Sequence, residues 1–544
     1  MKPNILIIIP ARGGSKGIPR KNLRALAGKP LIYYSIQTAL GSKFQPDVYV
    51  STDDGEIAAI SEKIGAKIIN RDASKSQDHT TLDPVIFDGY QQAREKEGKD
   101  YDLIVTLQPT SPLLKSTSLD MALERLIEEP TIDTIISARD DTHLTWKREK
   151  GRYVPNYTKR VNRQYMEPVF KETGGFLITR GSVISENNRI GPHVELYLLH
   201  GGEDIDIDTY EDWSLCEFYL KRKKILFVVS GYQQIGLGHV YNTLLVANDI
   251  LNHQIEFLVD DQSQLAFDKI ASKNYVVHMQ VRENIVDDIL QLTPDVVIND
   301  CLDTSESYMA ALKQVGIRTI NFEDLGPGAR LADLVINAIY PEREVLPQHY
   351  FGQEYFILRD EFILTSLNQP AEHVRRVLLT FGGVDPNNYT CKVIEAIHPY
   401  CCERGIEIFV VAGFGYTQYE TLETYKDIKV FCNSMTIAEH MNGADIIFTS
   451  AGRTTYEVAS LQVPSIVLAQ NERELTHFFA SAEYGFLNLG LGTSVSRQEI
   501  LQAFVGLVEN YQSRQYMSGL MAKSDLASGR KRTLKLVNDI LEQE

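Results

Sequence analysis

Cysteine is scarce in this 544-residue sequence, and its spacing argues against a disulfide framework. Only six cysteines are present, and the adjacent pair Cys401 and Cys402 lacks the C-x-x-C spacing typical of zinc sites. No apolar run approaches the length of a membrane-spanning helix, and the chain opens on a strand without a charged-then-apolar leader. We therefore expect a cytoplasmic protein with no membrane span.

An excess of positive charge is also missing. Lysine and arginine number 55 against 72 aspartates and glutamates, which gives a formal net charge of −17. This balance argues against a general binder of nucleic acid or anionic membranes, although a local cationic loop can still bind one nucleotide. The hydrophobic content of 43% is ordinary for a globular protein, and the length predicts roughly two to four domains.

The start of the chain carries the clearest functional pattern. Residues Ile5–Ile9 form an aliphatic run typical of a strand buried on both faces of a parallel sheet. The loop that follows holds three glycines and four cations, Arg12, Lys16, Arg20 and Lys21. Glycines let backbone N–H groups approach an anion, and so many cations would repel one another without a polyanion among them. The loop therefore predicts a triphosphate site, although neither the Walker spacing nor G-x-G-x-x-G is present.

Taken whole, the string from Ile5 to Asn22 resembles the signature of the CMP-sialic acid synthetases, a family of sugar-activating cytidylyltransferases. A surface turn with solvated charges is the alternative. The resemblance implies that this loop binds the phosphates of CTP and that Arg12, Lys16 and Lys21 take part in catalysis. The CTP-binding residues that it implies here are Ala11, Arg12, Gly13, Gly14, Ser15, Lys16, Lys21 and Asn22.

Strand and helix patterns alternate from residue 1 to about residue 220, which predicts an α/β domain with a mostly parallel, Rossmann-like sheet of GT-A type. Ligands on such sheets collect at the carboxyl ends of the strands. One of these ends, Gln108–Leu114, resembles the Q-P-T-S-P-L-R element of the same family, with Leu114 in place of the final arginine. The further CTP contacts that the resemblance implies come from Gln108, Thr110, Ser111, Arg71 and Asp78.

The block from residue 163 to residue 176 resembles the part of the family that faces the acidic sugar, with Thr173 where asparagine is usual. A guanidinium group matches a carboxylate in bidentate fashion, so Arg163 is the expected partner of the sugar carboxylate. A solvated surface arginine is the alternative. The implied sugar-binding residues are Gln108, Arg163, Gln164, Gly174 and Gly175.

Two aspartates near the end of this domain form the second strong signal. On an extended segment, Asp206 and Asp208 point to the same side, and hard carboxylate oxygens favour Mg²⁺. Thr209 and the acids after it also fit a capped helix N-terminus, and both interpretations can hold together. The resemblance assigns the metal to Asp206 and Asp208, which makes them candidate catalytic residues and Mg²⁺ the expected cofactor.

Together these parts imply one reaction. The anomeric hydroxyl of a nine-carbon α-keto acid sugar attacks the α-phosphorus of CTP and pyrophosphate leaves, driven by positioning and charge stabilisation. No general base stands out in the sequence. The sugar is a nonulosonic acid such as sialic, legionaminic or pseudaminic acid, and another keto-acid sugar such as Kdo is the alternative. The resemblance also implies a homodimer that pairs through this domain.

A new aliphatic strand, Ile225–Val229, opens the second half and is followed by another glycine-containing loop. Two further sets of strand patterns predict two Rossmann-like lobes, residues 225–369 and 370–544, with a cleft between them. The motifs resemble the two-lobed GT-B glycosyltransferases and, within them, the UDP-sugar hydrolase of pseudaminic acid synthesis.

The glycine loop of this half keeps the core of the hydrolase motif G-x-G-H-x-x-R, with Asn242 in place of the arginine. The resemblance implies that His239 activates water for attack at C1 of a UDP-aminosugar. A structural histidine, a glycosyltransferase and a non-catalytic nucleotide-sugar-binding module remain alternatives. The implied UDP-sugar-binding residues are Gly236, Gly238, His239, Gly383, Asp385, Ser450, Gly452, Thr454, Glu457 and Asn471.

Overall fold

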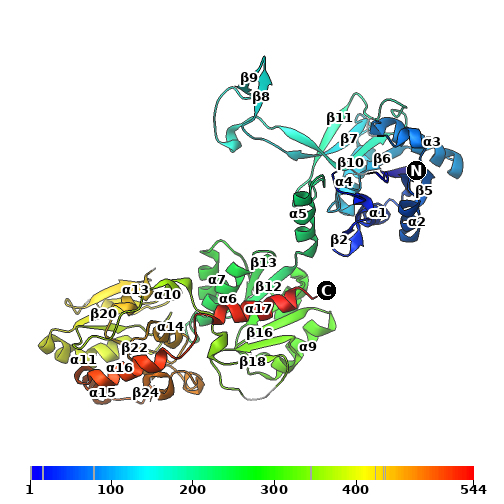
Figure 1. Ribbon diagram of the computed structural model, residues 1–544. Helices are drawn as coiled ribbons and strands as arrows, with labels where there is room; N and C mark the ends of the chain where they lie inside the picture. Colours follow the sequence, from blue (N-terminus) through cyan, green and yellow to red (C-terminus); the bar gives the residue numbers. More distant parts are fainter. Residues whose placement is uncertain are drawn as a thin grey trace. The chain divides into compact units, whose positions relative to one another are not determined.

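A computed structural model of the protein describes residues 3–14, 17–77, 80–342, 346–422, 424–432, 434 and 436–543. The chain divides into two compact units, Met1–Arg222 and Lys223–Glu544. The boundary between them in the sequence falls between residues 220 and 225, the two predicted domain limits. One large, mostly parallel sheet lies in the first unit and two parallel sheets lie in the second (Figure 1). The predicted α/β fold class is therefore confirmed. Within the described ranges, every helix is too short or too polar to cross a bilayer.

The first unit is built on a seven-stranded sheet in the order β11-β7-β10-β6-β1-β4-β5. Strand β10 runs antiparallel to both neighbours, and the other paired strands are parallel. The run in β1 is buried because Leu6 and Ile8 face one core while Ile7 and Ile9 face another. The strands are β1 (Ile5–Pro10), β4 (Asp47–Thr52), β5 (Lys67–Asn70), β6 (Leu103–Leu107), β7 (Thr134–Asp140), β10 (Phe170–Arg180) and β11 (Val194–Leu198).

Helices cover both faces of this sheet, since α1, α2 and α4 contribute to one core and α3 to the other. Helix α2 begins directly after Asp54, because the Asp54 carboxylate accepts hydrogen bonds from the backbone N–H groups of Glu56 and Ile57. Thr209 and Asp212 form a capping box at the start of α5. The helices are α1 (Leu31–Leu40), α2 (Gly55–Ile64), α3 (Leu82–Glu97), α4 (Ser116–Glu128) and α5 (Tyr210–Lys221).

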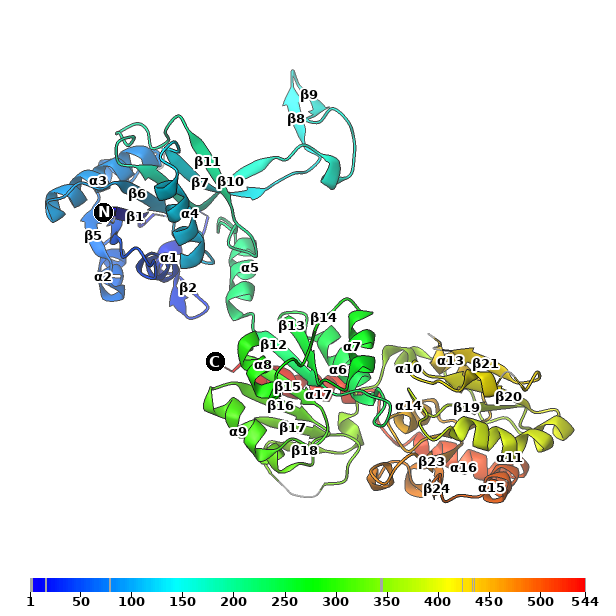
Figure 2. The same cartoon turned by 180° about the vertical axis from the view of Figure 1, so that it is seen from behind.

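Between β7 and β10 the chain leaves the sheet as an arm, residues 141–169. The arm carries the hairpin of β8 (Trp146–Glu149) and β9 (Arg152–Pro155), and Figures 1 and 2 show it projecting from the body of its own unit. Large side chains on it are exposed, with Trp146 at 56%, Tyr153 at 74% and Tyr165 at 72%.

The second unit contains two lobes, with the strand orders β14-β13-β12-β15-β16-β17-β18 and β21-β20-β19-β22-β23-β24. All strand pairs in both sheets are parallel. The first-lobe strands are β12 (Lys224–Val229), β13 (Gln254–Val259), β14 (Val276–Met279), β15 (Val296–Asp300), β16 (Arg318–Phe322), β17 (Leu334–Asn337) and β18 (His349–Phe351). The second-lobe strands are β19 (Arg376–Leu379), β20 (Glu407–Ala412), β21 (Lys429–Cys432), β22 (Ile446–Thr449), β23 (Ser465–Ala469) and β24 (Phe486–Leu491).

The sequence pattern misses four strands of this unit, β14, β18, β21 and β24. All four lie at sheet edges and are only partly buried, so they lack the continuous apolar run that marks the inner strands. The helices are α6 (Gly238–Asp249), α7 (Gln264–Ala271), α8 (Ile285–Leu292), α9 (Glu306–Gln314), α10 (Asp360–Leu364), α11 (Tyr389–Arg404), α12 (Tyr419–Leu422), α13 (Ile437–Asn442), α14 (Thr454–Leu461), α15 (Arg497–Glu509), α16 (Tyr511–Met521) and α17 (Gly529–Leu541).

The last helix returns to the first lobe. Figure 1 shows α17 lying against the first lobe, and its Val537, Ile540 and Leu541 are buried in the core of that lobe. Arg530 forms a bidentate ion pair with Asp249, with both hydrogen bonds at 2.6 Å. The two lobes of this unit are therefore joined by two chain crossings, one near residue 370 and one before α17. The predicted boundary at residue 370 separates the two sheets correctly, but α17, which lies after it in the sequence, packs in the first lobe.

Candidate active sites

The cationic loop after β1 meets the segment that holds the two aspartates, as the sequence predicts. Lys21, in the short 3-10 helix η1 (Lys21–Leu23), donates a hydrogen bond from Nζ to the Ile207 carbonyl at 2.5 Å and lies 3.5 Å from Oδ1 of Asp208. The Ile207 N–H donates to the carbonyl of Thr110 at 2.8 Å. Three segments that are remote in sequence thus meet at the carboxyl ends of β1 and β6.

Asp206 lies among buried oxygen atoms that have no hydrogen-bond partner among the described residues. Its Oδ1, the Thr110 hydroxyl and the Ser111 hydroxyl are all buried, and none has a partner in hydrogen-bonding geometry among the described residues. Burial raises the pKa of Asp206 and the charge of Asp208 adds to this, while the nearby Thr110 hydroxyl and Lys21 oppose it. Burying polar atoms without hydrogen-bond partners costs free energy, so these three oxygens are suited to bind a cation or a polar ligand.

Gly174 and Gly175 lie in β10, and Gly174 lies next to these buried oxygens. A Cβ at Gly174 would come 2.9 Å from Oδ1 of Asp206 and 3.0 Å from both the Thr110 and Ser111 hydroxyls. A Cβ at Gly175 would come 2.9 Å from the Ser137 hydroxyl. Glycine at both positions is therefore explained by close packing, and a direct sugar contact stays a prediction. The N–H of Gln108 donates to the Gly174 carbonyl at 3.3 Å, which ties the Gln108 loop to the same strand.

Several predicted CTP residues shape the loop itself. The buried Asn22 amide donates to the carbonyl of Arg12 at 3.0 Å, and the Gly13 N–H donates to Oδ1 of Asp53 at 3.0 Å. Arg71 is buried and donates to the carbonyl and hydroxyl of Ser51, and burial lowers its pKa. These contacts hold the loop in place. Ala11 is buried at the end of β1, a Cβ at Gly14 would meet nothing within 4 Å, and Ser15, Lys16 and Asp78 lie outside the described residues.

Three further positions differ in their surroundings from the rest of this site. Arg163 and Gln164 lie on the arm in the 3-10 helix η3 (Arg163–Tyr165), where both are exposed and Arg163 pairs with Asp140 at 3.4 Å. Leu114, which replaces the arginine of the resembled family, is buried in the core under the sheet. The structure thus places the predicted sugar-binding pair on the arm, apart from the sheet edge that carries Asp206.

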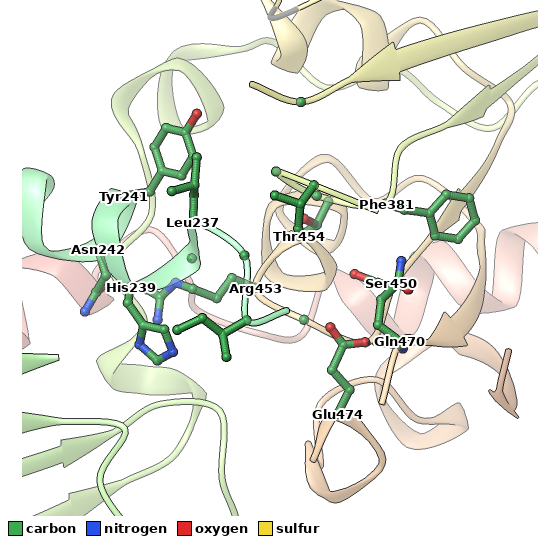
Figure 3. A pocket seen from close by; sticks show the side chains of 18 of the residues that line it. Leu237, His239, Tyr241, Asn242, Phe381, Ser450, Arg453, Thr454, Gln470 and Glu474 are labelled. Carbon is green, nitrogen blue, oxygen red and sulfur yellow. Dashed lines mark hydrogen bonds between the residues drawn. The ribbon is translucent and has the colours of Figure 1, made fainter. Parts of the chain in front are cut away.

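A cavity of about 600 Å³ lies between the two lobes of the second unit (Figure 3). Nine of the ten predicted UDP-sugar residues line it. The exception is Asp385, whose buried carboxylate accepts hydrogen bonds from the backbone N–H groups of Tyr389 and Thr390 and from the Gln470 amide. Asp385 therefore fixes the loop before α11, and a direct ligand contact from it stays a prediction. The nine lining residues are Gly236, Gly238, His239, Gly383, Ser450, Gly452, Thr454, Glu457 and Asn471.

The histidine of this cleft belongs to a carboxylate dyad. His239 Nδ1 lies 2.5 Å from Oδ1 of Asp300, which is fully buried at the end of β15. The Asn242 amide donates to Oδ2 of Asp300 at 2.8 Å, and Arg453 of the other lobe donates to Oδ1 of Asn242 at 2.7 Å. Figure 3 shows His239 and Asn242 side by side with Arg453 reaching toward them. An Nδ1–H bound to a carboxylate leaves Nε2 as the basic nitrogen.

Sequence reasoning missed Asp300, Glu323, Arg453 and Glu474, although Asp300 does stand where the β15 run of apolar residues ends. Burial raises the pKa of both Glu323 and Glu474 to about 7. Glu323 is 1% exposed and lies 3.4 Å from Arg453. Carboxyl groups in a cleft whose pKa lies near 7 can take up and release protons near neutral pH, which makes them candidates for proton transfer.

Glu457 has a partner in the structure. Arg359 donates from Nε to Oε1 of Glu457 at 2.9 Å, and its Nη2 forms an ion pair with the same oxygen at 2.9 Å. The predicted contact of Glu457 with a UDP-sugar therefore requires this carboxylate to share or exchange its partner.

The first unit is thus an α/β domain with cations and carboxylates at one sheet edge, and the second is a two-lobed unit with a cavity between its lobes. A cytidylyltransferase family model matches residues 6–172. An uncharacterized protein of Methanocaldococcus jannaschii is 31% identical over 52% of this chain and 66% of its own length. N-acylneuraminate cytidylyltransferase A of Danio rerio is 34% identical over 39% of this chain and 50% of its own length.

Pseudaminic acid cytidylyltransferase of Campylobacter jejuni is 31% identical over 40% of this chain and 96% of its own length. Through its first unit, this chain belongs to the cytidylyltransferase family. Among solved structures, MurG of Acinetobacter baumannii covers 58% of this chain and 99% of its own at 16% identity and a TM-score of 0.42. A CMP-2-keto-3-deoxy-manno-octonic acid synthetase complexed with CTP covers 40% and 98% at 17% identity and a TM-score of 0.31.

Proposed function

We propose that the first unit transfers CMP from CTP to the anomeric hydroxyl of a nonulosonic acid and releases pyrophosphate. The observation that carries this proposal is the meeting of Lys21 with the segment of Asp206 and Asp208 at one sheet edge. The substrate class is supported by relatives that are named for sialic, pseudaminic and legionaminic acids. In the proposed step, the anomeric hydroxyl loses its proton to solvent and its oxygen bonds to the α-phosphorus. The bond from this phosphorus to the pyrophosphate oxygen breaks, and pyrophosphate leaves.

Mg²⁺ is the proposed cofactor of this step, with Asp206 and Asp208 as its protein ligands. The fit rests on the buried Oδ1 of Asp206, which has no hydrogen-bond partner among the described residues, and on the preference of Mg²⁺ for carboxylate oxygens. When bound, the ion neutralises phosphate charge. Lys21 and Arg12 place further positive charge at the phosphates, and Lys21 also holds the Asp206–Asp208 segment through the Ile207 carbonyl.

The test is CTP turnover by the full chain in the presence of Mg²⁺ and one added sugar. We expect pyrophosphate and a CMP-sugar with at least one of sialic, legionaminic and pseudaminic acid, and none after Asp206→Ala combined with Asp208→Ala. Turnover with Kdo alone would move the substrate class to another keto-acid sugar. Turnover that survives the double substitution would refute the assigned metal site.

We further propose that the arm mediates homodimerisation. The exposed Trp146, Tyr153 and Tyr165 give it an apolar surface that a second copy of the same unit can cover. Arg163 and Gln164 lie on the same arm, so dimer formation is a route by which they reach a sugar site. Light scattering of the full chain checks this, since Tyr153→Ser with Tyr165→Ser should yield monomers. A dimer that persists at low concentration in this variant argues against the arm.

For the second unit we propose hydrolysis of a UDP-aminosugar. The supporting observation is the dyad of His239 and Asp300 at the wall of a cavity that also presents Thr454 at the N-terminus of α14. His239 Nε2 takes a proton from water, the water oxygen bonds to C1, and the bond from C1 to UDP breaks. Asp300 stabilises the imidazolium that forms.

Release of UDP from UDP-aminosugars in water tests this second activity. UDP that appears only when an acceptor sugar is added identifies a glycosyltransferase in place of a hydrolase. If UDP-sugars bind and change CTP turnover while His239→Ala leaves every activity unchanged, the unit is a binding module. UDP release that requires His239 and no acceptor supports the proposal.

A further inference from the structure

Three side chains of the second lobe that neither proposed reaction uses come together at its surface. His398 and Cys402 lie on α11, and Asp427 lies in the loop between α12 and β21. The Nε2 atom of His398 is 2.9 Å from Oδ2 of Asp427 and 3.5 Å from Sγ of Cys402, and this Sγ is 3.3 Å from the same Oδ2. None of the three lines the cleft cavity.

Helix α11 positions two of these side chains next to each other. His398 and Cys402 are four residues apart, which places their side chains on one face of α11. The helix is anchored from below by Ile397 and Cys401, both buried in the lobe core. The Tyr425 ring packs edge-on against the His398 imidazole at 5.1 Å and restricts its rotation. The donor atoms are therefore held close to one another by packing.

An imidazole nitrogen, a sulfur and a carboxylate oxygen form a donor set for zinc, whereas Mg²⁺ and Ca²⁺ are bound by oxygen. Tetrahedral zinc, with bonds of about 2.3 Å to sulfur and about 2.0–2.2 Å to nitrogen and oxygen, separates its ligand atoms by roughly 3.4–3.6 Å. The observed separations of 2.9, 3.3 and 3.5 Å need to expand by only a few tenths of an ångström. No other such group of three or more was found among the described residues.

We propose that His398, Cys402 and Asp427 bind a zinc-class divalent cation, with the fourth coordination position open to water. The ion would tie the loop of Asp427 to the outer face of α11. Because three ligands meet only in the folded lobe, binding stabilises that lobe. This site is independent of the nucleotide chemistry proposed above, and a scan for C-x-x-C spacing does not detect it.

Titration of the full chain with Co²⁺, in buffer that contains Mg²⁺, tests this proposal. A tetrahedral site with a thiolate ligand gives intense visible absorption and a near-ultraviolet charge-transfer band, whereas an all-oxygen site at Asp206 and Asp208 gives no thiolate band. We expect one equivalent of Co²⁺ to produce these bands and Zn²⁺ to abolish them. The bands should disappear in Cys402→Ser and persist in the matched control Cys432→Ser, which changes another exposed cysteine of this lobe.

The proposal is overturned if wild-type protein gives no thiolate band or if Cys402→Ser keeps it at full intensity. A second measurement uses only wild-type protein and so does not depend on the variant folding. Zn²⁺ should slow alkylation of Cys402 by iodoacetamide at least about tenfold while Cys432 reacts at its original rate. Equal alkylation rates of Cys402 with and without Zn²⁺ also refute the site.

Discussion

Glu323 offers a quantitative test of the cleft, because its burial ties the stability of the second unit to pH. The side chain is 1% exposed, and burial raises its pKa from an ordinary value of 4.5 to about 7 even with Arg453 nearby. Between these two values the folded unit holds a proton that the unfolded chain has released. Stability is therefore fully present below pH 4.5 and is lost progressively as the pH rises through 7.

The perturbation is Glu323→Gln, which keeps the size of the side chain and an oxygen that can accept from the backbone N–H of Ala338, as the carboxylate does. The gap between 4.5 and about 7 corresponds to roughly 3 kcal/mol of stability. We therefore expect the free energy of unfolding of the variant, relative to wild type, to rise by about 3 kcal/mol between pH 4.5 and pH 8.

The assay is urea unfolding of the full chain at several pH values, followed by two signals. Both tryptophans, Trp146 and Trp213, lie in the first unit, so their fluorescence follows that unit and serves as an internal control, while far-UV circular dichroism follows both units. The exposed Glu283→Gln is the matched control and should leave the pH dependence unchanged. Parallel pH curves for wild type and Glu323→Gln would show that this carboxyl ionises normally and would refute the reasoning.

Three other substitutions test the two sites. Asp206→Asn should slow CMP-sugar formation about 10²–10³-fold at every Mg²⁺ concentration, measured as pyrophosphate release, and a wild-type rate contradicts the metal role. Gly174→Ala brings a Cβ to 2.9 Å from Oδ1 of Asp206. We expect this change to destabilise the first unit by about 1–3 kcal/mol in fluorescence-monitored unfolding. Gly55→Ala is the control and should leave stability unchanged, because a Cβ there meets no atom within 4 Å. Asp300→Asn should slow UDP release about 10²-fold or more and shift the pH dependence of kcat; an unchanged profile would mean that His239 does not depend on this carboxylate.

The sheet rules explain why much of the site could be predicted. In a parallel sheet the strands end at one edge, so residues after β1 and β6 meet although about 100 residues separate them in the chain. The same rule gathers residues from both lobes around the cleft, where nine of ten predicted positions line the cavity. Lys21 and Asp208 were assigned to one site by the family resemblance, and the structure places Nζ of Lys21 3.5 Å from Oδ1 of Asp208.

What the sequence could not give is the direction of individual side chains. Asp385 and Arg71 both lie in the loops where they were predicted, yet Asp385 caps backbone N–H groups and Arg71 binds the backbone of Ser51. Arg163 was assigned to the sugar by its motif, and the arm that carries it has no apolar periodicity that fixes its path. Asp300 was overlooked because a single acid at a strand end carries no spacing signal.

In the second cleft, the lobe opposite His239 supplies a cation, Arg453. Asn242 replaces the arginine of the resembled hydrolases, and from sequence alone this change removes a positive charge. In the structure, Arg453, which directly precedes α14, places its guanidinium 2.7 Å from the Asn242 oxygen and 3.4 Å from Glu323. Positive charge is thus retained beside His239 but is supplied by the opposite lobe. Because that contact spans the cleft, the electrostatics at His239 depend on the relative position of the two lobes. Under the proposed hydrolysis, a ligand that draws the lobes together would therefore change the charge beside the dyad of His239 and Asp300.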